Sequence, residues 1–133
     1  MAAARFGYVI VYVADVDAAV AFHRAAFGFE LRMRHESGQY SELATGETTL
    51  AFAGHELGAA NFPGGYRAGD DGDAPLGAEL AFVVDDVSHA VDAALAAGAS
   101  LLRAAEEKPW GQTVAYVRGP EGSLIELCTP MAG

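Results

Sequence analysis

The only tryptophan of this chain, Trp110, lies in the stretch "KPWGQ", between Pro109 and Gly111. A proline and a glycine on either side favour a turn, where an indole can present a flat aromatic face with an N–H at its edge. Such a face can stack on a flat or cationic compound and contribute roughly 0.5–2 kcal/mol to its binding. We therefore predict that Trp110 contacts a ligand. The alternative is that the indole closes one end of the fold.

Two carboxylates and two phenols stand inside or beside apolar runs. Glu126 interrupts "SLIEL", and strand alternation places its side chain on the same face as Leu124. Its carboxylate either pairs with an arginine or lysine or contacts a ligand, and the sequence leaves both open. Glu79 begins the run "ELAFVV", where a charge can also simply be exposed. Tyr8 and Tyr12 belong to the run "YVIVYV", and we count all four among the ligand-binding residues together with Trp110.

The histidines offer no acid–base machinery. His23, His35, His55 and His89 lie in helix, turn or strand-end patterns, so we expect each to pack or to lie on the surface. No Ser–His or Cys–His pair can be argued, so the catalytic residues are unknown. Cys128, near the end of an apolar run, is predicted to be an inert small hydrophobe.

Composition narrows the possible partners. The 133 residues suit a single domain, residues 1–133, and the net charge of −10 argues against nucleic acid or an anionic membrane as a partner. The sequence contains no run of 18 or more apolar residues, so no membrane-spanning helix is predicted. One cysteine excludes an internal disulfide and favours a cytoplasmic location. Neutral or cationic small molecules remain as ligands.

These residues are carried by an internal duplication. The first copy opens at Tyr8 with "YVIVYVADVDAAVAFHRAAFGFEL" and the second at Glu79 with "ELAFVVDDVSHAVDAALAAGASLL". Each is an apolar strand, an aspartate and an amphipathic helix. Asp15 and Asp86 are expected to cap the two helices by accepting from the free N–H groups of the first turn.

Three strand patterns follow each helix, so each copy is a βαβββ module. The helices are expected to end at Gly28 and Gly98. The predicted strands cover residues 30–36, 40–44 and 48–53, then 100–104, 112–118 and 123–128. Module one spans residues 5–57 and module two spans residues 78–130. The linker 58–77 is rich in Gly, Pro and Asp and is predicted to be a mobile loop or lid.

The duplication, with "VYVADVDAAVAFHRAAFGFEL", "LAFVVDDVSHAVDAALAAGA" and "PWGQTVAYVRGPEGSLIEL", resembles the vicinal oxygen chelate superfamily. This superfamily includes glyoxalases, dioxygenases and bleomycin resistance proteins, and the "PWG" motif is most similar to the last of these. The resemblance implies an α+β fold whose two βαβββ modules form a curved mixed sheet with a concave cleft and helices outside. It also implies a homodimer.

Enzymes of this superfamily hold a divalent metal at four strand positions. In this sequence the first positions of the two modules are Tyr8 and Glu79, and the last strand of module two supplies Glu126. The last strand of module one reads "TTLAFAG", which offers no donor at the corresponding place. A catalytic zinc site needs three protein ligands. The sequence therefore predicts no metal and no other cofactor.

We accordingly predict a metal-free protein that binds an aromatic or cationic small molecule, and the expected role of this binding is sequestration, as in an antibiotic resistance protein. Whether it is an enzyme stays open. The alternative is a metal-dependent lyase, isomerase or dioxygenase of the glyoxalase type, and a scaffold with an empty cleft is a third reading.

Overall fold

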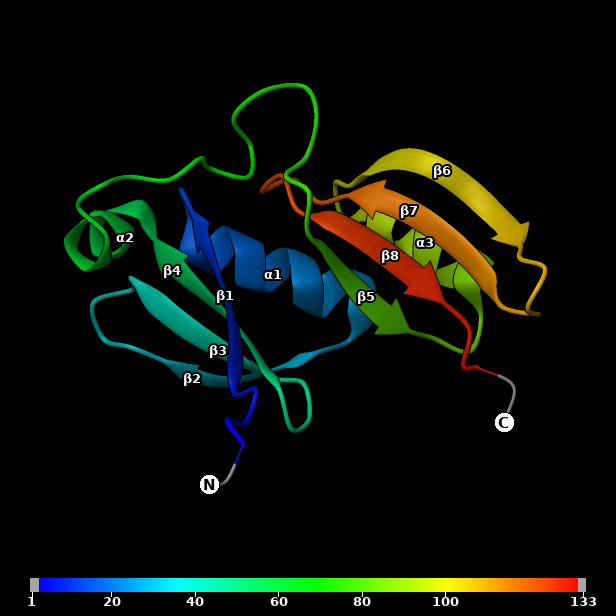
Figure 1. The fold of residues 1–133 in the computed structure, drawn as a ribbon, viewed down its shortest axis with the longest axis horizontal. Coiled ribbons are helices and arrows are strands. Elements are labelled where there is room, and N and C mark those ends of the chain that lie inside the picture. The colour runs from blue at the N-terminus through cyan, green and yellow to red at the C-terminus, as the bar shows by residue number, and fades with distance from the viewer. Residues whose placement is uncertain (1–2, 132–133) are drawn as a thin grey trace. The chain divides into compact units, whose positions relative to one another are not determined.

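The computed structural model of the protein describes residues 3–131, which form two successive βαβββ units (Figure 1). The first contains β1 (Tyr8–Val13), α1 (Val16–Phe27), β2 (Glu30–Arg34), β3 (Tyr40–Ala44) and β4 (Thr49–Gly54), followed by α2 (His55–Asn61). The second contains β5 (Glu79–Val83), α3 (Val87–Ala96), β6 (Ser100–Glu107), β7 (Thr113–Arg118) and β8 (Leu124–Cys128). None of the helices in this part of the chain is long and apolar enough to cross a membrane.

The strands form two four-stranded mixed sheets of the same topology, β1-β4-β3-β2 and β5-β8-β7-β6. In each, the first strand of the module pairs in parallel with the last, and the other neighbours are antiparallel. The α+β class and the two βαβββ modules are confirmed. The strands do not join into one continuous sheet, because hydrogen bonding ends at the edge strands β1 and β2, and β5 and β6.

The described residues divide into two compact units. One comprises residues 3–24 and Gly28–Tyr66, and the other comprises Ala25–Phe27 and residues 67–131. The short α2 was not predicted, and its residues 58–61 fall inside the segment expected to be linker. From here on, module one and module two denote these two units, in place of the narrower ranges 5–57 and 78–130 predicted from the sequence.

Local sequence signals start and end the long helices. The Asp15 carboxylate accepts from the Ala18 N–H and the Asp86 carboxylate from the His89 N–H, each over 3.0 Å, so both predicted caps are confirmed. Gly28 ends α1 in the left-handed region, at φ 75°. The α3 helix ends at Ala96, so Gly98 lies beyond it, still with a positive φ of 114°.

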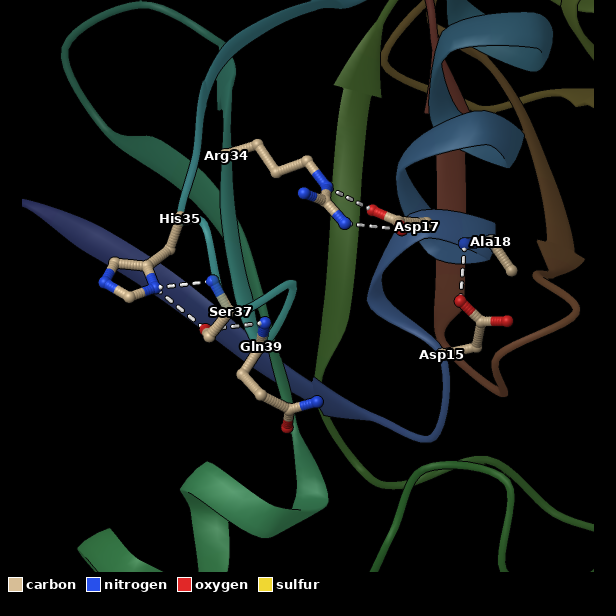
Figure 2. Close-up of polar contacts among 7 residues, drawn as sticks. All are labelled: Asp15, Asp17, Ala18, Arg34, His35, Ser37 and Gln39. Carbon is tan, nitrogen blue, oxygen red and sulfur yellow. Dashed lines mark hydrogen bonds and ion pairs between the residues drawn. The ribbon is translucent and has the colours of Figure 1, made fainter.

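In module one an ion pair ties β2 to the first turn of α1 (Figure 2). The Arg34 guanidinium donates through Nε to one Asp17 carboxylate oxygen over 2.9 Å and through Nη2 to the other over 3.0 Å. Two parallel bonds fix direction as well as distance. The neighbouring turn is closed at His35, whose Nδ1 accepts from the Ser37 N–H over 3.1 Å.

The core of module one contains a histidine. His23 of α1 is fully buried, and its ring lies 4.8 Å, between centroids, from that of Phe52 in β4. Burial lowers the pKa of His23 to about 4, because a charged imidazolium is disfavoured away from water. The prediction that this histidine packs is confirmed.

In module two α3 covers one face of the sheet. Val87, Ala90, Val91 and Ala94 are buried on the helix, and Ala115, Val117, Ile125 and Leu127 are fully buried on the strands. Apolar side chains on alternate strand positions therefore face the helix. The intervening positions lie on the opposite face, which carries polar side chains beside the buried Val114 and Cys128.

Candidate functional site

The face of module two that α3 leaves uncovered is named the open face here. The pairing register of the strands determines which side chains lie level with one another, as a row, on this face. Glu79 lies level with Leu124 and Arg118, and the next row contains Glu126, Tyr116 and Arg103. Glu126 shares this face with Leu124 and Cys128, as strand alternation predicted.

Glu126 lies near the middle of the open face and is half-buried. Its Oε1 accepts a hydrogen bond of 2.9 Å from the Tyr116 hydroxyl on the neighbouring strand. This bond raises the pKa of Tyr116 above its ordinary value, and burial and the negative charge of Glu126 act in the same direction. The phenol therefore stays protonated and holds the carboxylate in one orientation.

Glu79 approaches the same carboxylate from β5. The pKa of Glu79 is raised, first by burial, then by the negative charge of Glu126 and by a hydrogen bond to it. In the part of the chain that the structure describes, no arginine, lysine or histidine forms an ion pair with either group. We call Glu79 and Glu126 the carboxyl pair. Two adjacent carboxylates repel each other, and a bound cation relieves that repulsion.

Module one carries a comparable group of side chains that is already neutralised. Glu42 of β3 accepts from Arg32 Nη2 over 2.8 Å and from the Tyr40 hydroxyl over 2.8 Å. The pKa of Glu42 is lowered, mainly by Arg32, and the pKa of Tyr40 is raised to about 12, mainly by burial. This carboxylate therefore has its cation within the chain, in contrast to the carboxyl pair.

The two predicted tyrosines of module one differ in their surroundings. Tyr8 is 54% exposed and lines an open groove of about 1010 Å³, together with Arg5, Arg32 and other residues. Tyr12 is covered on one ring face by Tyr66, with ring centroids 4.8 Å apart and planes 26° from parallel. The Tyr66 hydroxyl lies 2.7 Å from Nδ1 of His55. Tyr8 is thus open to a ligand, while Tyr12 already has a stacking partner.

Trp110 lies in the turn between β6 and β7 and is 57% exposed. Its indole Nε1–H donates to Oε1 of Gln112 over 2.7 Å, and the Gln112 amide donates to the Thr129 carbonyl over 2.8 Å. The indole is thus oriented by hydrogen bonds. Within module two it stands at the opposite end of β7 from Arg118, the residue level with Glu79. The structure does not bring Trp110 together with Glu79.

The donor set fits a resident metal poorly. The register makes Ala51 the module-one counterpart of Glu126, because each stands two residues after the partner of the module's first strand residue. Ala51 is fully buried and has no donor, and its neighbour Tyr8 offers only a phenol. Over residues 3–131 no three side chains of His, Cys, Asp or Glu are grouped so as to hold a metal ion. A catalytic zinc site generally needs three protein ligands.

Sequence reasoning missed Tyr116, Arg118 and Tyr66 as parts of the surroundings of the predicted residues. Tyr116 and Arg118 alternate with the buried Ala115 and Val117, so their shared face was readable. Their alignment with the carboxyl pair could not be predicted from the sequence, since it depends on the pairing register of the strands. Tyr66 lies in a glycine-rich segment without any periodic pattern.

Comparison with known proteins places this arrangement in a family. The sequence profile of the Glyoxalase/Bleomycin resistance protein/Dioxygenase superfamily matches residues 5–127. The chain belongs to this superfamily. The match covers both modules, so the predicted family is confirmed, whereas a special closeness to its bleomycin-resistance members stays a prediction.

Two relatives of the superfamily are similar over most of their length. A probable lactoylglutathione lyase from Vibrio parahaemolyticus is 32% identical over 133 residues, which is 96% of this chain and 91% of the relative. A lactoylglutathione lyase from Haemophilus influenzae is 31% identical over 125 residues, covering 90% and 88%. A solved superfamily enzyme from Burkholderia phytofirmans has a TM-score of 0.77 at 27% identity, covering 95% and 98% of the two chains.

Proposed function

We propose that the protein binds a small cationic molecule at the carboxyl pair without a resident metal ion. The observation that carries the proposal is the pairing of Glu79 and Glu126 on the open face with no cation from the described chain. The positive group of a ligand would take the place that an arginine side chain takes beside Glu42 in module one. The net charge of −10 favours the approach of a cation over longer distances.

The ligand is inferred to be flat as well as cationic. The exposed indole of Trp110, in the same module as the carboxyl pair, provides an aromatic face for a ligand long enough to reach both. Amidines, guanidines and planar amines are the simplest compounds with these properties, and bleomycin-type glycopeptides combine them in one molecule. Sequestration of such a compound would protect a cell from it.

A second candidate function is metal-dependent chemistry of the lactoylglutathione lyase type. Two relatives at 32% and 31% identity bear that name, which favours this function over other superfamily activities. The donor set argues against it, because Ala51 and Tyr8 replace two of the four expected ligands. We therefore rank it second. In either case we expect the protein to be cytoplasmic and to form a homodimer. Size-exclusion chromatography with light scattering would test the dimer.

A thermal-shift screen separates the two candidates. Protein treated with EDTA is screened against benzamidine, a bleomycin and matched uncharged compounds. The proposal predicts a saturable rise in the midpoint with a cationic compound, absent in the Glu79→Gln/Glu126→Gln double variant. Formation of lactoylglutathione from methylglyoxal and glutathione after addition of nickel or zinc, with no response to the cations, would replace the proposal by the second candidate.

A further inference from the structure

One arginine holds a segment of the linker against the end of β7. We call residues 69–74 the strap. The Arg118 guanidinium donates to its backbone carbonyls through Nη2 to Gly69 over 2.9 Å and through Nη1 to Asp73 over 2.9 Å and Gly72 over 3.2 Å. Arg118 Nε also donates to the Gly122 carbonyl over 3.1 Å. The fixed fork of a guanidinium can hold several acceptors in one geometry at once.

A glycine provides a second contact of the strap. A Cβ on Gly122, in the β7–β8 turn, would collide with the Gly69 carbonyl group and with the Asp70 backbone nitrogen. Only a residue without a side chain allows the two backbones to approach so closely. The strap is also folded on itself, since the Asp71 N–H donates to the Ala68 carbonyl over 3.1 Å. These contacts give residues 69–74 a defined conformation in the structure, and the mobility of the linker predicted from composition stays a prediction.

The strap lies at the Glu79 end of the open face. Arg118 is level with Leu124, and Leu124 is level with Glu79, so all three side chains share that face and row. Figure 1 shows the linker descending beside the β7–β8 turn to the start of β5. Arg118 is therefore near the carboxyl pair, yet its donors are occupied by strap carbonyls.

We propose that Arg118 is a positioning residue and that the strap it holds is a wall of the cation site at the carboxyl pair. With its guanidinium bonded to carbonyl oxygens, Arg118 orders the strap and forms no ion pair with Glu79 or Glu126. A ligand at the carboxyl pair then meets the strap at one side, so its size and shape are selected there. The wall role rests on the proposed function, whereas the positioning role does not.

Hydrogen exchange measures the positioning role. The Asp71 amide is the reporter, because it is hydrogen-bonded inside the strap. In Arg118→Ala we expect exchange of this amide to accelerate at least about tenfold. The strap can then open without the free-energy cost of breaking the hydrogen bonds to the guanidinium. Methylguanidinium at millimolar concentration should restore part of the protection. Arg103→Ala is the matched control, since Arg103 lies on the same face and bonds to Glu106, and it should leave the Asp71 amide unchanged.

Arg118→Lys keeps the charge and supplies a second variant if Arg118→Ala fails to fold. This variant should also accelerate exchange of the Asp71 amide, since a lysine ammonium group cannot hold several carbonyl oxygens in the fixed geometry of a guanidinium. Unchanged Asp71 exchange in a folded Arg118 variant would refute the positioning role.

Calorimetric titration with benzamidine or a bleomycin tests the wall role, and we expect an affinity loss of about tenfold in Arg118→Ala and none in Arg103→Ala. Faster exchange with unchanged affinity would refute the wall and leave the proposed function standing. If wild type binds neither compound, the wall role fails together with the proposed function, and the exchange data still decide the positioning role.

Discussion

Tyr116 donates its phenolic hydrogen to Glu126 over 2.9 Å, across the β7–β8 pair. The bond fixes a carboxylate that Glu79 approaches from β5, and the phenol supplies a hydrogen bond without supplying a positive charge. The charge of the carboxyl pair is thus left for a ligand to neutralise. This relationship links the fold to the proposed binding, because the pairing register of three strands brings the side chains together.

Neutralising Glu79 should stabilise the protein while weakening binding. In Glu79→Gln the repulsion from Glu126 is lost, so the thermal midpoint at pH 8 should rise. The gain is small, roughly 1–4 °C, because the Glu79 side chain as a whole is exposed, so solvent screens its charge even though Glu126 and the sheet partly desolvate its carboxyl group. Scanning calorimetry measures it, with Glu107→Gln at the exposed end of β6 as the control. A lower midpoint in Glu79→Gln than in the control would contradict the repulsion.

Cation affinity should rise with pH across the titration of Glu79. The pKa of Glu79 is raised above the ordinary 4.5, so near and below that raised pKa the group is protonated and neutral. A cation binds the ionised pair more tightly, so binding expels the proton and tightens as pH increases. Titration with benzamidine at several pH values tests this, and the dependence should flatten in Glu79→Gln. An affinity that falls with rising pH would count against a cationic ligand.

The buried His23 should make the fold sensitive to mild acid. Its folded pKa of about 4 lies below the ordinary 6.5, so the unfolded state binds more protons between these values. Stability is therefore full above pH 6.5 and falls towards pH 4, by on the order of 3 kcal/mol. Urea unfolding at each pH measures the loss, which should be smaller in His23→Leu. Equal losses in both proteins between pH 6.5 and 4.5 would show that other groups dominate.

Removing the indole should cost little stability. Trp110 is 57% exposed, and its visible role is the bond from Nε1 to Gln112, so Trp110→Ala should destabilise by about 1 kcal/mol or less. Urea unfolding gives the value. If the indole contacts the ligand, the same variant weakens binding and the wild-type fluorescence responds to it. A loss of several kcal/mol would mean that the indole is a structural plug.

Much of the fold was predictable because it depends on local signals. The aspartates at residues 15 and 86 cap their helices by contacts three residues away, and strand alternation placed Glu126 correctly. The site was less predictable because it depends on register. Only the pairing shows that Tyr116 reaches Glu126 and that Ala51 is the counterpart of Glu126. The α2 helix and the strap were missed, since composition alone does not show which backbone groups find partners.

Calorimetric titration of EDTA-treated protein with a bleomycin or benzamidine tests the central claim most directly. The wild type should bind at least one of them saturably without added metal. The Glu79→Gln/Glu126→Gln double variant, folded by circular dichroism, should lose at least about tenfold in affinity, a loss of 1.4 kcal/mol, while Glu107→Gln binds like wild type. Binding of equal strength in the double variant, or binding by wild type only after a divalent metal is restored, would contradict a metal-free cation site at the carboxyl pair.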